Sequence, residues 1–210
     1  CIVYAVMYSN MKVAIIKYNA GNIGSVVNAV RRLGIEPVVT DDAKEIGEAD
    51  RVIFPGQGEA RSTMAYLKEH GLDQVIVNLK QPVLGICIGM QLLCRHSEEY
   101  DTDCLGVFDV DVKRFVPKVH EEKVPQMGWN TVEQTRSALF DGFGEREFVY
   151  FIHSYYVPLC DYTAAVTDYV QPYSSALHKD NFYATQFHPE KSGSVGERIL
   201  RNFITKGGVE

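Results

Sequence analysis

The chain has 210 residues, of which 46% are hydrophobic and 23% are charged, and its formal net charge is −6 at pH 7. A chain of this length can bury a substantial core within one domain, and its apolar and charged content is that of an ordinary globular protein. It has no basic block, which disfavours nucleic acid and anionic membranes as partners, and no apolar run that approaches a membrane span.

The cysteines argue for a free thiol rather than for a disulfide framework. Their number is odd, and neither a CxxC pair nor a Cys/His metal-ligand spacing occurs among Cys1, Cys87, Cys94, Cys104 and Cys160. We therefore expect no metal site. We also expect a cytoplasmic protein, because a reducing compartment keeps a thiol available.

The first ten residues stand apart from the rest. They precede Met11, where a strand begins, and they carry neither a basic region nor a long apolar core, so a signal peptide is not expected. We interpret residues 1–10 as an N-terminal extension or a remnant of cloning, with an additional edge strand as the alternative. Residues 11–210 are then a single domain.

Strands and helices alternate through the first half of the chain. The apolar spacing predicts strands over 11–17, 36–40, 51–54 and 83–86, and helices over 26–33, 59–70 and from residue 88 through Cys94. This alternation predicts an α/β fold whose mostly parallel central sheet is flanked by helices. In such sheets, reactive groups gather at the carboxyl ends of the strands.

The second half of the chain has a different pattern. Short β segments are expected over 107–115, 148–154 and 164–167, with a hairpin that turns at 179–181 and a last amphipathic helix over 195–204. These segments predict an antiparallel β extension in the C-terminal half.

A glycine-flanked cysteine separates the fourth predicted strand from the helix that follows it. In Gly85-Ile86-Cys87-Ile88-Gly89-Met90-Gln91 the glycines permit a tight, strained corner, so the Cys87 side chain stands clear of the backbone. The sulfur then lies at the positive end of a helix, where the thiolate is favoured. We interpret Cys87 as a nucleophile, with a buried structural thiol as the alternative. Cys94, on the same predicted helix, is expected to pack in the core.

Far downstream, Gln186-Phe187-His188-Pro189-Glu190 offers a base and a group to orient it. His188 alone would be interpreted as a structural histidine. However, Pro189 holds the backbone of His188 extended, and Glu190 is close enough along the chain to reach the imidazole. Cys, His and Glu in this order are the parts of a thiol nucleophile system.

A second glycine-rich turn follows the third predicted strand. Taken alone, Pro55-Gly56-Gln57-Gly58 is a simple turn. Its functional interpretation is an oxyanion hole, because glycines let backbone N–H groups approach a developing negative oxygen. The N–H of Ile88, directly after the nucleophile, would be the second donor.

Other polar and aromatic residues carry weaker signals. Gln91 is placed on the nucleophile's helix face to bind an amide or carboxylate, and Glu99, about one turn beyond the expected helix end, is placed to pair with an ammonium group. By default both are solvated polar residues. Trp129, Tyr150 and the aromatic segment 153–156 are by default core residues, although tryptophan is also favoured at interfaces.

Taken together, these motifs resemble those of the class I, triad-type glutamine amidotransferases, from Met11 to about Lys206. Within that family the sequence is similar to the glutaminase subunits of imidazole glycerol phosphate synthases, which belong to histidine biosynthesis. The narrower resemblance is carried by Gly21-Asn22, the Pro-Gly-x-Gly turn, Gly128-Trp129-Asn130 and Phe187-His188-Pro189-Glu190-Lys191-Ser192.

The resemblance implies a reaction without a cofactor, in which Cys87 attacks the γ-carboxamide carbon of L-glutamine, His188 transfers protons and Glu190 orients the imidazole. It implies oxyanion donors at Ile88 and in the Gln57–Gly58 peptide region. The glutamine pocket would be formed by Gly58, Gln91, Glu99, His153, Ser154 and Tyr155. Ammonia would pass to a (β/α)8-barrel cyclase in a heterodimer, whose interface or gate positions would be Asn22, Trp129, Tyr150 and Lys191.

One departure from the family pattern lies in the oxyanion turn, where Gln57 replaces the usual valine. The family resemblance implies that this peptide reorients when the partner is loaded, so we expect the partner to activate the chain. Three alternative functions remain: the glutaminase of another amidotransferase such as pyridoxal phosphate synthase, a non-catalytic partner-binding subunit, or a thiol hydrolase of γ-glutamyl peptides. The Pro-Gly-x-Gly and Gly-Trp-Asn segments argue against the first, and the intact triad argues against the second.

Overall fold

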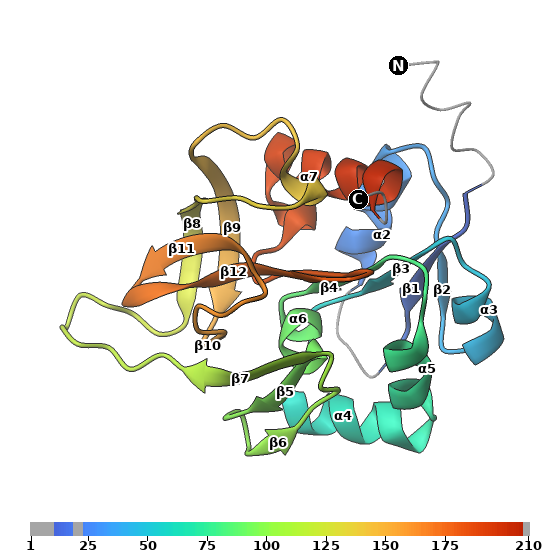
Figure 1. The fold of residues 1–210 in the computed structure, drawn as a ribbon, viewed down its shortest axis with the longest axis horizontal. Helices are drawn as coiled ribbons and strands as arrows, with labels where there is room; N and C mark the ends of the chain where they lie inside the picture. Colours follow the sequence, from blue (N-terminus) through green and yellow to red (C-terminus); the bar gives the residue numbers. More distant parts are fainter. Residues whose placement is uncertain (1–10, 19–22, 208–210) are drawn as a thin grey trace.

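The computed structural model describes residues 11–18 and 23–207. Its centre is a seven-stranded sheet in the order β11-β12-β13-β4-β3-β1-β2 (Figure 1). The parallel strands are β13 (Phe182–Thr185), β4 (Val83–Ile86), β3 (Arg51–Phe54), β1 (Val13–Ile16) and β2 (Val38–Thr40). An antiparallel extension from β13 consists of β12 (Gln171–Lys179) and β11 (Thr163–Tyr169). The predicted fold class, a mostly parallel sheet with an antiparallel C-terminal extension, is confirmed.

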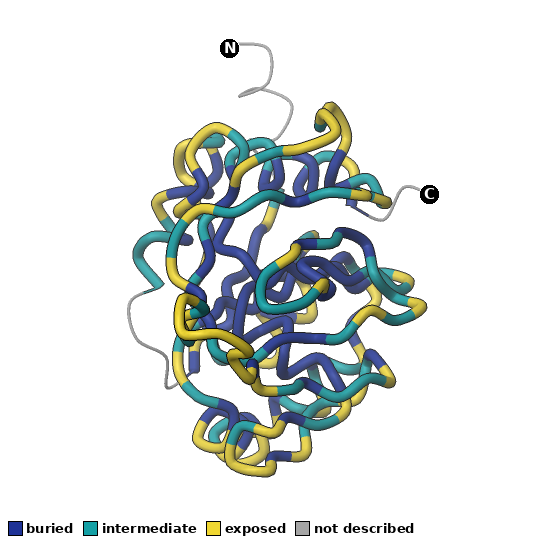
Figure 2. The backbone as a smooth tube through the Cα atoms, turned by 90° about the vertical axis from the view of Figure 1, so that its left-hand side faces the viewer, coloured by how far each residue is buried: buried dark blue, intermediate teal, exposed yellow. Residues whose placement is uncertain are grey.

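The central strands are buried on both faces because their side chains alternate between two apolar clusters. Val13 and Ile15 of β1 belong to one cluster, whereas Ala14 and Ile16 belong to the other. The first cluster is covered by α2 (Gly24–Arg32) and α7 (Gly193–Lys206), above the sheet in Figure 1. The second is covered by α3 (Ala43–Gly47), α4 (Ala60–Glu69), α5 (Leu72–Asn78) and α6 (Ile88–Leu93). Figure 2 shows these buried central segments between exposed outer ones.

Two smaller sheets lie beside the main one. The first has the order β10-β7-β5-β6, formed by β5 (Cys94–Ser97), β6 (Thr102–Asp103), β7 (Phe108–Arg114) and β10 (Tyr155–Tyr156). The second is an antiparallel pair of β8 (Gln126–Val132) and β9 (Glu147–His153). Two short 3-10 helices are η1 (Ala138–Phe140) and η2 (Pro189–Lys191).

The helix after Cys87 is shorter than predicted. It ends at Leu93, and Cys94 has extended backbone (φ −72°, ψ 178°) and begins β5. One carbonyl near the helix end is taken by a distant segment, because Leu105 N–H donates to the Leu92 oxygen at 2.9 Å. The prediction that Cys94 lies on the helix is therefore wrong, whereas its burial in the core is confirmed by an exposure of 0%.

The apolar spacing also missed α3, α5, β5, β6 and β8, most of which are too short to show a period. For α3 a local signal was present, since the Asp42 side chain accepts the N–H groups of Lys44 and Glu45 at 2.8 and 2.9 Å. The interpretation of residues 1–10 and the interface position Asn22 fall outside the described residues. Among the described helices, none is long and apolar enough to cross a membrane.

Candidate active site

The chain turns sharply at Cys87, between β4 and α6. Its backbone has φ 51° and ψ −107°, in the left-handed range that is costly for a residue with a Cβ. The Cys87 N–H donates to the Thr185 oxygen at 2.7 Å, so the strand ladder continues up to the corner before the helix begins. The residue lines a cavity at this end of the sheet, although it is only 9% exposed. The corner that the glycine spacing predicts is therefore present.

Two glycines allow this corner to lie directly against the turn that follows β3. A Cβ on Gly56 would stand 2.0 Å from the Ile86 carbonyl oxygen, and a Cβ on Gly89 would stand 2.3 Å from the Phe54 carbonyl oxygen. No other residue type fits at either place without backbone movement. The contact brings the 55–58 turn beside the nucleophile.

His188 and Glu190 form a buried pair beside the sulfur. Glu190 Oε1 lies 2.7 Å from His188 Nδ1, and the His188 and Glu190 side chains are 4% and 3% exposed. Burial lowers the pKa of His188, but the negative charge of Cys87, its hydrogen bond to the ring and the Glu190 carboxylate outweigh burial and raise the pKa to about 10. Since Nδ1 is held by Glu190, Nε2 is the ring nitrogen left for the sulfur.

Ser192 ties the backbone of this pair to β9. Its hydroxyl donates to the His188 oxygen at 2.7 Å and accepts the Tyr150 N–H at 2.9 Å. The His188 N–H in turn donates to the Tyr150 oxygen at 2.9 Å. The imidazole is thus positioned by both η2 and β9, which come from distant parts of the chain.

A buried tyrosine holds the turn that was predicted to form the oxyanion hole. The Tyr18 hydroxyl donates to the Pro55 oxygen at 2.6 Å and accepts the Gln57 N–H at 3.1 Å. Burial raises the pKa of Tyr18, so the phenol is neutral and serves as both donor and acceptor. The Gln57 N–H is therefore engaged by Tyr18 in this structure. The Ile88 N–H begins α6, where the first N–H groups have no partner within the helix.

These groups meet at a cavity of about 340 Å³, where β3 and β4 end. Its walls contain the predicted nucleophile, base, oxyanion turn and glutamine pocket. The lining residues are Gly56, Gln57, Gly58, Cys87, Ile88, Gln91, Glu99, Ile152, His153, Ser154, Tyr155, His188 and Lys191. Glu190 lies behind His188, and Trp129 and Tyr150 are outside the lining.

Burial shifts the pKa values of two side chains in the cavity walls, Glu99 and His153, in opposite directions. Glu99 reaches the cavity from the β5–β6 turn, not from just beyond the helix as its spacing predicted, because β5 intervenes. Burial raises the pKa of Glu99, and its Oε2 accepts the Ala60 N–H at 2.8 Å. Burial lowers the pKa of His153 to about 4, so its ring is neutral, with Nδ1 2.7 Å from the Tyr155 oxygen. The walls therefore combine a half-buried carboxyl group with a neutral imidazole.

Comparisons with known proteins agree with this geometry. The family described as "Glutamine amidotransferase class-I" matches residues 14–206. The chain belongs to this family. Two solved structures show the same fold at low identity: a crystal structure of a glutamine amidotransferase (TM-score 0.72, 21% identity, 94% of this chain and 99% of that one) and a glutamine amidotransferase from Thermotoga maritima (TM-score 0.61, 22% identity, 92% of this chain and 82% of that one).

Curated relatives within the class-I amidotransferases are closer in sequence. The imidazole glycerol phosphate synthase subunit HisH of Bacteroides thetaiotaomicron is 68% identical over 194 residues, which cover 92% of this chain and 99% of that protein. The protein of the same name from Shewanella loihica is 42% identical over 206 residues, which cover 93% of this chain and 91% of that protein.

This class-I amidotransferase has one buried side chain at its nucleophile for which the sequence patterns suggested no role. The Gln186 Nε2 lies 3.7 Å from the Cys87 sulfur, and the Gln186 Oε1 accepts the Gln91 amide at 3.0 Å. A signal was available, since Gln186 stands two residues before His188 in an extended segment, and such residues point to the same side.

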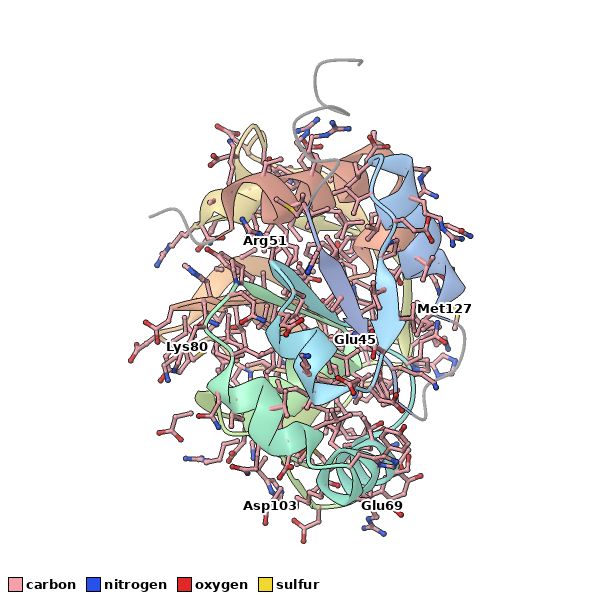
Figure 3. The ribbon with its side chains drawn as sticks, turned by 90° about the vertical axis from the view of Figure 1, so that its right-hand side faces the viewer. Glu45, Arg51, Glu69, Lys80, Asp103 and Met127 are labelled. Atoms are coloured by element: carbon pink, nitrogen blue, oxygen red, sulfur yellow. The ribbon has the colours of Figure 1, made fainter. Side chains whose placement is uncertain are left out.

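An exposed apolar face lies next to the cavity of the amidotransferase. Trp129 pairs with Tyr150 across β8 and β9, with ring centroids 6.0 Å apart, and it is 56% exposed rather than buried in the core. Met127, at the surface in Figure 3, and Phe148 lie on the same side of this sheet and are 62% and 59% exposed. We call Met127, Trp129, Phe148 and Tyr150 the β8–β9 face. It adjoins the cavity because the partner of Met127, Ile152, lines it.

Proposed function

We propose that this chain is the glutaminase subunit of an imidazole glycerol phosphate synthase. It hydrolyses L-glutamine to glutamate and ammonia and supplies the ammonia to a cyclase that makes imidazole glycerol phosphate and AICAR in histidine biosynthesis. The observation that carries this proposal is the 68% identity to a HisH subunit over 99% of that protein's length. The buried Cys87, His188 and Glu190 constellation supports it independently, because it supplies a nucleophile, a proton carrier and an orienting carboxylate.

In the first half of the reaction, the Cys87 thiolate attacks the γ-carboxamide carbon and forms a tetrahedral oxyanion. Backbone N–H groups of Ile88 and of the 57–58 region stabilise this oxygen. His188 is protonated while Cys87 is a thiolate, and it gives its proton to the departing nitrogen as the C–N bond breaks. Ammonia leaves, and a γ-glutamyl thioester remains on the sulfur.

In the second half, the neutral imidazole takes a proton from water, and the resulting hydroxide attacks the thioester carbon. The C–S bond breaks, the thiolate returns beside the protonated His188, and glutamate leaves as its carboxylate with release of the remaining proton. Glu190 keeps the same hydrogen bond to Nδ1 in both halves, so Nε2 carries each proton.

The substrate pocket combines groups that suit free glutamine. Glu99 presents a carboxylate and Gln91 an amide oxygen, both of which can accept hydrogen bonds from N–H groups of the substrate, such as its α-ammonium group. Gly58, Ser154 and the backbone near Tyr155 complete the walls.

The cyclase, a (β/α)8 barrel, docks on the β8–β9 face as the second subunit of a heterodimer. Large exposed aromatic side chains beside the cavity are typical of an interface centre, and Lys191 lies on the cavity rim that this face adjoins. Ammonia thereby passes from the sulfur to the partner without entering bulk water. The cytoplasm is the compartment that we propose, since the nucleophilic thiol must remain reduced.

Partner binding activates the glutaminase through the oxyanion turn. In the free chain the Gln57 N–H is bound to Tyr18 and is not available to a substrate oxygen. Cyclase and cyclase ligand shift the population to a turn in which this N–H faces the cavity. Unassisted hydrolysis, which would waste glutamine, is thereby kept slow.

The test is to mix the chain with the cyclase and follow imidazole product formed from glutamine or from ammonium salt. Cys87→Ala is expected to abolish the glutamine-dependent reaction and to leave the ammonium-dependent reaction unchanged. Loss of both reactions would show that Cys87 supports the complex structurally. If the wild type formed imidazole product from ammonium salt but not from glutamine, the proposed function would be overturned.

A further inference from the structure

We propose that Gln186 is a further catalytic residue, whose side-chain amide donates a hydrogen bond to the Cys87 thiolate in an orientation fixed by Gln91. This inference rests on the proposed glutaminase function for its role in turnover. The hydrogen-bond geometry itself belongs to the described structure.

Gln186 is placed for this role by the end of β13. It follows Thr185 directly, its N–H donates to the Ser175 oxygen at 2.9 Å, and it is 0% exposed. Its Nε2 lies 3.7 Å from the Cys87 sulfur, within range of a hydrogen bond to this large atom. A fully buried amide that cannot turn to water keeps this donor available to the sulfur throughout the reaction.

The orientation of the amide follows from its other neighbour. The Tyr155 carbonyl oxygen can only accept, so the Gln91 atom 3.0 Å from it is Nε2. The same Nε2 lies 3.0 Å from the Gln186 amide and gives it the second proton, so the Gln186 atom at that contact is the oxygen. The nitrogen of Gln186 therefore faces the sulfur.

This arrangement also separates two tasks within the Gln91 side chain. Both of its amide protons are used, one on the Tyr155 oxygen and one on Gln186. Its own oxygen is left for a donor on the substrate. The amide that contacts glutamine thus also holds the group that stabilises the nucleophile.

Few groups near the sulfur stabilise its negative charge. The Ile152 carbonyl oxygen, 3.8 Å from the sulfur, can only accept from a thiol and does nothing for a thiolate. Among the described side chains, His188 and Gln186 are the donors to it. The titratable groups that surround it are His188 with Glu190 behind it, Tyr18, Tyr173, His153, Glu99 and Lys191.

The experiment measures how readily Cys87 ionises. The rate of Cys87 alkylation by iodoacetamide is followed against pH in the full chain, with the modified peptide identified by mass spectrometry because Cys94, Cys104 and Cys160 are also free thiols. The alkylation midpoint is the pH at which the rate of Cys87 alkylation reaches half its maximum. Gln186→Met, which removes the donor without adding charge, is expected to raise this midpoint by about one pH unit. With cyclase and glutamine, kcat falls about tenfold, while the ammonium-dependent reaction is unchanged.

Gln81→Met is the matched control. Its amide donates to the Ile46 oxygen at 2.9 Å, beyond the opposite end of β4 from Cys87. Its alkylation midpoint is expected to equal that of wild type. An unchanged midpoint in Gln186→Met would overturn the proposal, and so would an equal shift in both variants.

A double-mutant cycle tests the part played by Gln91. Gln91→Glu puts a group that only accepts beside Gln186, whose amide must then turn its nitrogen away from the sulfur. The added charge raises the midpoint in any background, but loss of the oriented donor raises it only where Gln186 is present. The shift is therefore expected to be larger in the wild-type background than in the Gln186→Met background, and equal shifts would contradict the orienting role.

If the wild type shows no glutaminase activity with cyclase, the proposed function fails, whereas the alkylation midpoints still decide the contact between Gln186 and the sulfur.

Discussion

The Tyr18 hydroxyl accepts the Gln57 N–H at 3.1 Å and donates to the Pro55 oxygen at 2.6 Å, so one buried phenol binds two backbone groups of the turn beside the nucleophile. Thr63, on α4, lies on another side of the same turn. Its hydroxyl is buried without a partner in the described part of the chain and stands 3.0 Å from the position of a Cβ on Gly58. The observed orientation of the turn is thus stabilised by hydrogen bonds to Tyr18. The unpaired Thr63 hydroxyl could bind the turn in a different orientation.

Removal of the Tyr18 hydroxyl is expected to release this turn. A neutral buried hydrogen bond contributes about 1 kcal/mol, so Tyr18→Phe should raise glutaminase activity of the free chain about fivefold. The measurement is glutamate formation without cyclase. Activity with the cyclase and its ligand should change little, because the proposed activation breaks this hydrogen bond in the complex.

Tyr66→Phe is the control for this prediction, since its hydroxyl binds Asp41 at 3.0 Å, away from the turn. Its unassisted activity should equal that of wild type. If Tyr18→Phe were no faster than Tyr66→Phe without cyclase, Tyr18 would not restrain the oxyanion turn.

The Tyr18 contact shows where sequence reasoning stops. The strands at 51–54 and 83–86 were predicted with their observed bounds, because a buried parallel strand is a continuous apolar run between turn residues. The corner at Cys87 was predicted because its glycines have a local steric purpose. Tyr18 is 39 residues from Gln57 in the chain, and nothing in the pattern around either one specifies the other.

Other element bounds were not predicted from the apolar spacing, for a related reason. α6 ends at Leu93 because a distant segment takes the Leu92 carbonyl, a tertiary contact that overrides the apolar spacing through Cys94. Glu99 was associated with the cavity by family resemblance, but the β5–β6 turn that carries it there was not predicted. Local geometry and the pairing of Cys87 with His188 could therefore be predicted from sequence, because a motif marks each of them, whereas long-range contacts that no motif marks could not.

Gly56→Ala is expected to destabilise the fold and to disturb the site together. The added Cβ would stand 2.0 Å from the Ile86 oxygen and 2.7 Å from the Cys87 Cβ, so backbone must move. The expected loss is about 3 kcal/mol in the free energy of unfolding, measured with urea. Gly47→Ala, in α3 with nothing within 4 Å of its Cβ, should change stability by less than about 1 kcal/mol. Similar losses in the two variants would contradict the close contact between the β3 turn and the nucleophile corner.

The neutral state of His153 should make the protein sensitive to acid. Burial lowers its pKa from 6.5 to about 4, so the folded state binds fewer protons than the unfolded state between these values. The free energy of unfolding therefore falls as pH decreases from 6.5 toward 4. The full pKa shift of His153 corresponds to a loss of about 3 kcal/mol. His153→Gln removes this contribution, so its free energy of unfolding should depend less on pH across that window than the wild-type value does. His120→Gln, at an exposed position, should retain the wild-type dependence. An identical slope in all three proteins would show that His153 ionises as readily in the folded chain as in the unfolded chain.

The β8–β9 face is expected to supply much of the affinity for the cyclase. Trp129 is its centre, since it is 56% exposed and packs edge-on against Tyr150 at 6.0 Å. Trp129→Ala should weaken binding by about 2 kcal/mol, or about thirtyfold in Kd, measured by calorimetry. Val38→Ala is the control, because Val38 is an exposed apolar residue on β2, at the other edge of the main sheet (Figure 1). The cavity itself does not include Trp129, so alkylation of Cys87 in the free variant should proceed as in wild type. Equal Kd values for the two variants would place the cyclase on another face. Ammonia would then have to leave the cavity on a side away from β9.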